Sequence, residues 1–145
     1  LEIIKSDLDA LHAKVAQYEA VRARTIIIPS MEIELREGES YGGMALLENG
    51  APSYHLILLP GDESMNWADA MAWAKKLGGD LPNGQEQALL YANCKKQFNE
   101  AYYWSNTQHA NGSDCAWDQN FDHGLQDDLI KSASGRARAV RKLTI

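Results

Sequence analysis

Cysteine, proline and phenylalanine are scarce in this chain of 145 residues, which has two cysteines, four prolines and two phenylalanines. Two cysteines are too few for a structural zinc site, which takes about four ligands. Cys94 and Cys115 leave a disulfide open, but residues so far apart in sequence pair only if the fold brings them together. The alternative is two free thiols that pack as small hydrophobic side chains. We expect no bound metal and no cofactor.

Long apolar runs and a surplus of positive charge are also missing. The longest apolar runs are residues 25–29 and 56–60, far short of the about 20 residues that a membrane-spanning helix needs. Insertion into a membrane is therefore not expected. The net charge of -6 argues against nucleic acid as the main partner, because phosphate binding favours a basic surface. The basic residues gather near the end of the chain, where Arg136, Arg138 and Arg141 predict a strand with one side in solvent.

The remaining bulk properties are those of an ordinary globular protein. Hydrophobic residues make up 45% of the chain and charged residues 23%, and the length suits one domain with an appendage. No signal-peptide pattern is present. The first residue is Leu1 rather than Met, so we expect a processed or trimmed chain, or a piece of a longer protein.

Residues 1–24 predict the appendage, an N-terminal helix. Apolar residues recur at alternating steps of three and four, which is a heptad pattern with both seam positions filled. They are Leu1, Ile4, Leu8, Leu11, Val15 and Tyr18. So short a helix is marginal alone, and its narrow seam favours a parallel coiled coil over an amphipathic helix that packs within its own chain. We expect a homo-oligomer, with a trimer favoured and a dimer possible.

Residues 25–145 predict the globular domain, and its first part reads as strands. Residues 25–28 are a β-branched run and residues 31–35 alternate between apolar and polar side chains. Further strands are expected at 44–47 and 54–59, with Asn49-Gly50 as the hairpin turn between them.

Two helices are expected next. Asn66 is a good cap for a helix over 67–77 that Gly78-Gly79 would end. A second helix is predicted from Gly84 or Gln85 to Gln97. The expected inward residues are Trp67, Ala70, Met71, Trp73, Ala74 and Leu77 on the first helix, and Ala88, Leu89, Tyr91, Ala92 and Cys94 on the second.

The last third of the chain mixes aromatic and polar residues in three short segments, 102–107, 116–121 and 136–141. Polar, turn-rich sequence separates them, which is typical of a small antiparallel sheet with one buried face and long loops. Such a sheet presents side chains on a fixed platform, so recognition is favoured over catalysis. We expect Trp104 to belong to the core, while Trp117 suits the core or a surface equally.

This order of elements resembles the C-type lectin fold. The resemblance is carried by residues 66–70 (NWADA), 77–82 (LGGDLP), 86–90 (EQALL), 103–105 (YWS) and 138–141 (RAVR). More narrowly, the chain is similar to the Lcl C-terminal-domain family of bacterial, phage and prophage modules. That similarity is carried by residues 81–82 (LP), 103–107 (YWSNT), 116–121 (AWDQNF) and 135–141 (GRARAVR), and it covers about residues 40–143.

The resemblance implies an α+β, C-type lectin-like fold with two helices packed on small antiparallel sheets. It does not carry over calcium-dependent sugar binding. That activity uses a Glu-Pro-Asn or Gln-Pro-Asp tripeptide and a Trp-Asn-Asp segment, whereas here Trp117-Asp118 is followed by Gln119 and neither tripeptide occurs. Fold alone does not fix function.

The phage association of the family, together with the heptad seam, suggests a virion protein of the tail-fibre or receptor-binding type. Such a protein would be made in the bacterial cytoplasm, sit on the tail or surface of the phage particle and bind a bacterial surface glycan or protein. The alternative is a structural decoration or tail-assembly protein that contacts other virion proteins and has no host ligand.

An enzyme is not expected. Ser105 lacks the Gly-x-Ser-x-Gly turn of a hydrolase nucleophile, and the histidine and aspartate residues between 109 and 123 match no known metal-binding loop.

If a ligand binds, the outward positions of the polar region 106–128 are the candidates, with Tyr103 and Trp117 as stacking surfaces. The alternative is that this loop region is merely solvated. The candidate residues are Tyr103, Asn106, Gln108, His109, Asn111, Asp114, Trp117, Asp118, Asn120, Asp122, His123 and Asp127.

Overall fold

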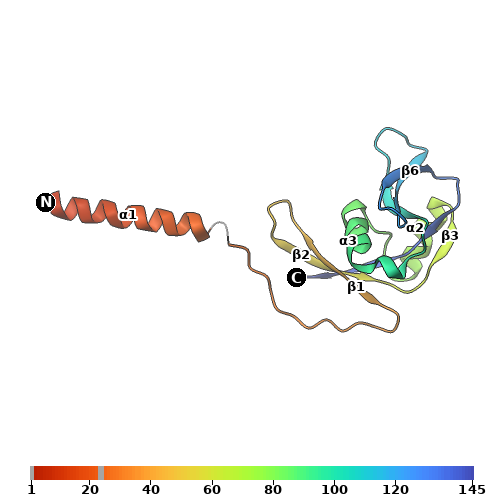
Figure 1. Cartoon of the computed structure of the whole chain (residues 1–145), viewed down its shortest axis with the longest axis horizontal. Coiled ribbons are helices and arrows are strands. Elements are labelled where there is room, and N and C mark those ends of the chain that lie inside the picture. The colour runs from red at the N-terminus through yellow and green to blue at the C-terminus, as the bar shows by residue number, and fades with distance from the viewer. Residues whose placement is uncertain (1, 23–24) are drawn as a thin grey trace.

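The computed structural model describes residues 2–22 and 25–145 and shows a mixed α+β protein (Figure 1). Its helices are α1 (Glu2–Arg22), α2 (Trp67–Lys76) and α3 (Gly84–Cys94), and the 3-10 turn η1 (Lys95–Gln97) follows α3. Its strands are β1 (Ser40–Leu46), β2 (Pro52–Leu58), β3 (Glu63–Met65), β4 (Tyr102–Gln108), β5 (Cys115–Asn120), β6 (Gln126–Ile130), β7 (Gly135–Ala137) and β8 (Val140–Thr144).

The strands form a small and a large sheet. The small sheet has the order β1-β2-β8 and is antiparallel, so the last strand of the chain pairs with one of the first. The large sheet has the order β3-β7-β4-β5-β6, with β4 and β7 parallel and the other neighbours antiparallel. β7 and β8 follow one another directly but lie in different sheets, which ties the sheets together.

Two clusters of buried side chains hold the helices against the sheets. Trp104 is the largest member of the first, which packs α2 against the large sheet, and its indole N–H donates to the carbonyl of Met65 at 2.9 Å. The second joins both sheets through α3, with Leu56 from β2, Leu90 from α3 and Phe121 after β5. Full burial of such a side chain contributes about 1.5–3 kcal/mol. Core placement of Trp104 is thus confirmed.

The local signals for turns and caps are confirmed. The side chain of Asn66 accepts from the backbone N–H of Asp69 at 2.9 Å, and α2 ends before Gly78, which has a φ of +86°. Gly50, with a φ of +85°, forms the turn between β1 and β2. Glycine adopts such positive φ angles at no steric cost.

Helix α3 begins with a reciprocal cap that allows a direct test. The Asn83 side chain accepts from the backbone N–H of Glu86, while the Glu86 carboxylate accepts from the backbone N–H of Asn83, each at 2.8 Å. Asn83→Ala is expected to lower the free energy of unfolding by about 1 kcal/mol, the usual worth of a cap. Urea unfolding measures it, and an unchanged midpoint would contradict the role of the cap.

The predicted strands at 25–28 and 31–35 are wrong. Residues 25–38 hold no strand, and their apolar side chains are largely exposed, up to 79% for Ile27. The composition of the segment suits a strand, but a strand needs a neighbour to pair with. Within the described chain, residues 25–38 join no ladder, and the small sheet has only the strands β1, β2 and β8.

The predicted inward face of α3 is also partly wrong. Ala88 and Ala92 are exposed, Leu89 and Tyr91 are half-buried, and Leu90 is fully buried. The helix ends at Cys94, and only the 3-10 turn continues to Gln97. The buried face is set by the sheets on either side of α3, which the spacing of apolar residues alone does not locate.

The prediction that the basic segment near the end of the chain forms a single strand with one side in solvent is wrong. Arg138 lies between β7 and β8, is buried, and donates to the backbone carbonyls of Leu59, at 2.7 Å, and Gln97. Arg136 pairs with Asp62 at 2.9 Å, and Arg141 pairs with Glu39 at 2.7 Å. The arginines therefore serve the fold. Cys94 and Cys115 are both free thiols.

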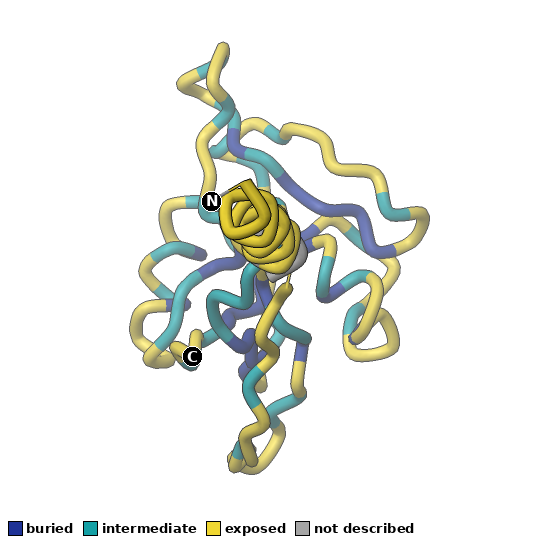
Figure 2. Tube along the Cα trace, turned by 90° about the vertical axis from the view of Figure 1, so that its left-hand side faces the viewer, coloured by how far each residue is buried: buried dark blue, intermediate teal, exposed yellow. Residues whose placement is uncertain are grey.

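Helix α1 is present as predicted and lies away from both sheets (Figure 1). Figure 2 shows it end-on, and residues 2–18 are exposed. The described seam residues Ile4, Leu8, Leu11 and Val15 are each between 45% and 69% exposed, and Tyr18 is 63% exposed. Leu1 lies outside the described residues. An exposed apolar seam of this kind suits association with a partner helix.

Candidate functional site

A cleft of about 270 Å³ lies where the start of α3 meets the β4-β5-β6 side of the large sheet. Thr107 comes from β4, Trp117 from β5 and Gln126 from β6. Gly84 and Gln87 come from the first turn of α3. The lining therefore combines one aromatic surface with amide and hydroxyl groups, and no ionisable side chain is among these five residues.

Trp117 provides the aromatic surface and is half-buried. The imidazole ring of His109 lies against the indole, with ring centroids 4.6 Å apart and planes inclined by 38°. His109 is itself held by the β4–β5 hairpin, because its backbone N–H donates to Cys115 O at 2.9 Å and its Nδ1 accepts from the backbone N–H of Asn111 at 3.2 Å. The indole is thus positioned by side-chain packing, which limits the entropy lost when a ligand stacks on it.

Gln126 fixes the wall on the β6 side. Its Nε2 donates to the carbonyl of Gly84 at 2.7 Å. This bond links the edge strand of the large sheet to the first residue of α3, across the two sides of the cleft. We expect a preformed cleft, as is usual for small-ligand sites.

Gln87 forms the floor of the cleft and is 1% exposed. Its Nε2 donates to the carbonyl of Tyr103 at 3.0 Å, while its Oε1 has no hydrogen-bond partner among the described residues. Leaving a buried acceptor unpaired costs about 1–3 kcal/mol. Because this oxygen is fully buried, it is closed off from the open part of the cleft.

Gln87 and Gly84 are absent from the sequence-based candidates, and so are Thr107 and Gln126. One signal for Gln87 does exist. It precedes Leu90 and Cys94 at steps of three and four, so it is a polar residue on a buried face of the helix. The others give no sequence signal, because only the pairing of β4, β5 and β6 brings them together.

Three predicted site residues are buried, so the expectation that they face outward is wrong. The Tyr103 side chain packs edge-on against Phe121, with centroids 5.2 Å apart, and its hydroxyl donates to Asp62. Asn120 shapes the turn after β5, where its Oδ1 accepts from the backbone N–H of Asp122 at 2.7 Å. The third, Asp118, is buried on β5. All three side chains belong to the core or to the turns of the large sheet.

The other candidates are spread over several parts of the large sheet and its turns. Gln108, His109, Asn111 and Asp114 belong to the β4–β5 end, where Gln108 accepts from Lys131 Nζ at 2.6 Å. Asp122 and His123 lie in the turn at the opposite end of β5, and both are exposed. Asn106 is half-buried beside Thr107, and Asp127 is exposed on β6. Of the predicted residues, the structure brings only Trp117 into the lining of the cleft, with His109 packed against it.

Asp118 is a buried carboxylate on β5 of the large sheet. Its Oδ1 is buried and has no hydrogen-bond partner among the described residues. Burial first, and then the neighbouring charges of Asp127 and Asp128, raise the pKa of this carboxyl to about 6. The side chain is therefore close to half-protonated in mildly acidic solution.

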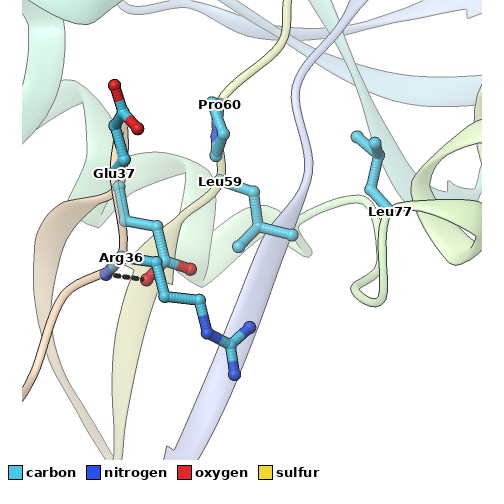
Figure 3. A pocket seen from close by; sticks show the side chains of 6 residues that line it. Arg36, Glu37, Leu59, Pro60 and Leu77 are labelled. Carbon is cyan, nitrogen blue, oxygen red and sulfur yellow. Dashed lines mark hydrogen bonds between the residues drawn. The ribbon is translucent and has the colours of Figure 1, made fainter.

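A second depression, of about 190 Å³, is lined by Leu59, Pro60, Leu77 and the charged residues Arg36, Glu37 and Glu39 (Figure 3). Its central carboxylate, Glu39, already accepts from the backbone N–H of Arg36 at 2.7 Å and from Arg141. The Arg141 hydrogen bonds hold the pKa of Glu39 down at about 2. These bonds anchor the segment that enters β1, so we assign this depression to structure.

No family model matches the chain, and no curated protein is significantly similar to it. Over residues 2–22 and 25–145, no helix is both long and apolar enough to cross a membrane. Within the same ranges, His, Cys, Asp and Glu side chains form no group of three suited to a metal ion. The function of the cleft beside Trp117 is therefore inferred from the residues that line it.

Proposed function

We propose that this protein is a lectin-like recognition module of a phage virion, of the tail-fibre or receptor-binding type, which binds a bacterial surface glycan or protein through the cleft beside Trp117. The observation that carries the proposal is the combination of a held indole with neutral amide and hydroxyl groups. Helix α2 packed on the large sheet, helix α3 packed between both sheets, and the pairing of the last strand β8 with β2 support the C-type lectin-like fold.

The chemistry of the cleft favours a glycan over a protein segment. A sugar ring offers an apolar face that stacks on an aromatic side chain and a rim of hydroxyls that pair with amides. Trp117 would supply the first contact, and Thr107 and Gln126 the second. No nucleophile or acid–base pair lies in the lining, so binding rather than catalysis is proposed.

The exposed seam of α1 supports oligomerisation, with a trimer favoured. An oligomer carries several globular domains on one coiled coil. Once one domain has bound, the effective concentration of the others raises the overall affinity, often by a factor of about 10²–10⁴. A shallow site that holds one small ligand group needs this gain to attach a particle to a cell. The virion location of the protein is part of the same proposal.

Trp117→Ala tests the site. It is expected to weaken attachment of the oligomer to Gram-negative cells at least tenfold, because the stacking surface is lost while the core is untouched. Attachment of labelled protein to a panel of strains measures it. Tyr102→Ala is the matched control, since Tyr102 is an exposed aromatic residue of the same sheet outside the cleft. Equal attachment by both variants would refute this site.

A structural virion protein is the second candidate. The observation in its favour is the exposed apolar run Ile26-Ile27-Ile28, which suits contact with other virion subunits. This candidate predicts a protein enclosed in the particle and no attachment to any strain.

A further inference from the structure

We infer that a cavity just after α1 is filled by a second copy of this chain, with Ile28 of one copy lying in the cavity of the next. The inference rests on the proposed oligomer of α1, and it adds the surface through which the globular domains pack together. It is carried by an open cavity, by an exposed isoleucine that does not line the cavity of its own copy, and by the short link from both to α1.

The cavity has a volume of about 440 Å³ and lies between the segment that follows α1 and the β1–β2 hairpin. It is lined by residues of the segment 25–29, by Asn49, Ala51 and Pro52, and by Ile145, and none of these side chains is ionisable. The hairpin and the end of the chain lie on the side of the domain that faces α1 (Figure 1). A space of about 150 Å³ already holds a benzene molecule, so an isoleucine side chain fits.

Three consecutive isoleucines border this cavity and are exposed in the single chain. Ile26 is 50% exposed, Ile27 79% and Ile28 68%. Ile26 lies along the hairpin, because its Cδ1 is 3.4 Å from the position that a Cβ would take on Gly50. Ile28 is not among the lining residues, so its side chain is available for the cavity of another copy. Contiguous exposed apolar side chains of this kind mark an interaction surface.

The short link to α1 makes a second copy the occupant. Helix α1 ends at Arg22, and the three peptide steps from there to Thr25 span at most about 11 Å. Packed helices have axes about 8–10 Å apart, so in the oligomer this segment of every copy begins beside the same coil. The association that buries the seam of α1 therefore also brings the cavity of one copy close to Ile28 of the next, at a high effective concentration.

Charge and symmetry both suit contact between identical copies here. Residues 25–31 contain no charged side chain, although the whole chain has a net charge of -6. Copies therefore meet at this segment without the like-charge repulsion that other surfaces would cause. The contact joins two different surfaces, a projecting isoleucine and a cavity, so a closed ring of copies fills every cavity. A cyclic trimer meets this condition.

The contact would fix the globular domains relative to the coil. Each domain would then present the cleft beside Trp117 in a constant arrangement around one axis. Domains that are already arranged lose less freedom when several of them bind one cell surface. The isoleucine segment thus serves attachment although it lies outside the cleft.

Crosslinking between copies tests the contact directly. Two differently tagged forms of the full chain are produced together, one with Ile28→Cys and the other with Ala51→Cys, so a link between the introduced thiols must join two copies. Cys115→Ser in every form removes the more exposed native thiol. Leu125→Cys replaces Ala51→Cys in the control, because Leu125 is 53% exposed and does not line the cavity. After mild oxidation, we expect at least tenfold more mixed product with Ala51→Cys than with the control.

Ile28→Asp tests the contribution of the contact to association. It is expected to raise the dissociation constant of the oligomer at least tenfold, measured by analytical ultracentrifugation, because association would remove water from the carboxylate without supplying a counter-ion. Leu125→Asp is the matched control and should stay within threefold of the parent. Both side chains are exposed in the single chain, so neither substitution disturbs the core of the domain.

The outcomes separate this inference from the proposed function. An oligomeric parent that gives no more mixed product with Ala51→Cys than with Leu125→Cys would overturn the inference alone. An Ile28→Asp oligomer as tight as the parent would do the same, and the isoleucines would then be left for another virion subunit. A parent that sediments as a monomer would remove the proposed oligomer and the inference together.

Discussion

Replacing Leu8 and Leu11 by aspartate is expected to convert the oligomer to monomers and to weaken attachment to cells by about 10² or more. Both residues lie on the exposed seam of α1, at 48% and 56% exposure. Association would remove water from the aspartate at a seam position, and no opposite charge would replace that water. A coiled coil of this length is not stable enough to bear this cost in free energy. Analytical ultracentrifugation and cell attachment measure the two effects.

The control places the same charges elsewhere on the helix. Ala10→Asp with Ala13→Asp puts aspartates at the same spacing of three residues outside the seam, on positions that are exposed. This control should remain oligomeric. The affinity for a free glycoside should be unchanged in both variants, because the globular domain and its cleft are not altered. A parent protein that sediments as a monomer would contradict the role assigned to the helix.

Asp118→Asn is expected to stabilise the protein at neutral pH by about 3 kcal/mol. The pKa of Asp118 is raised to about 6, first by burial and then by the charges of Asp127 and Asp128, whereas an unfolded aspartate titrates near pH 4. The difference of about two units corresponds to about 3 kcal/mol, at 1.36 kcal/mol per unit. The amide has nearly the same shape and carries no charge to desolvate.

The sign of the pH dependence follows from linkage. A carboxyl whose pKa is raised by folding binds its proton more tightly in the folded state, so it favours folding when protonated. The stability of the parent should fall relative to Asp118→Asn as the pH rises from about 4 through 6. Urea unfolding at pH 4, 5.5 and 7.5 measures this. A stability difference that does not change with pH, or an amide variant that is less stable at pH 7.5, would refute it.

Features set by neighbouring residues could be predicted from the sequence. Asn66 caps α2, Gly78 follows its end, and Asn49-Gly50 turns the first hairpin. Each depends on a side chain or a φ angle within a few residues, and the sequence contains that information directly. The α+β class follows from the same local signals.

Features that depend on distant partners could not be predicted. Residues 31–35 alternate like a strand but have no strand to pair with. Arg138 alternates like a surface residue but is buried against the carbonyl of Leu59. Gln87 meets Trp117 only because α3 packs over β5. Spacing along one element tells which residues share a face, but not what that face contacts.

The central claim is that this protein attaches to a bacterial glycan through the cleft beside Trp117. The most direct test is binding of the purified oligomer to a panel of Gram-negative cells, before and after periodate oxidation and with and without calcium. We predict binding that periodate abolishes and that calcium does not change. Binding that survives periodate would point to a protein receptor, binding that requires calcium would contradict the metal-free site, and no binding to any strain would favour the structural virion role.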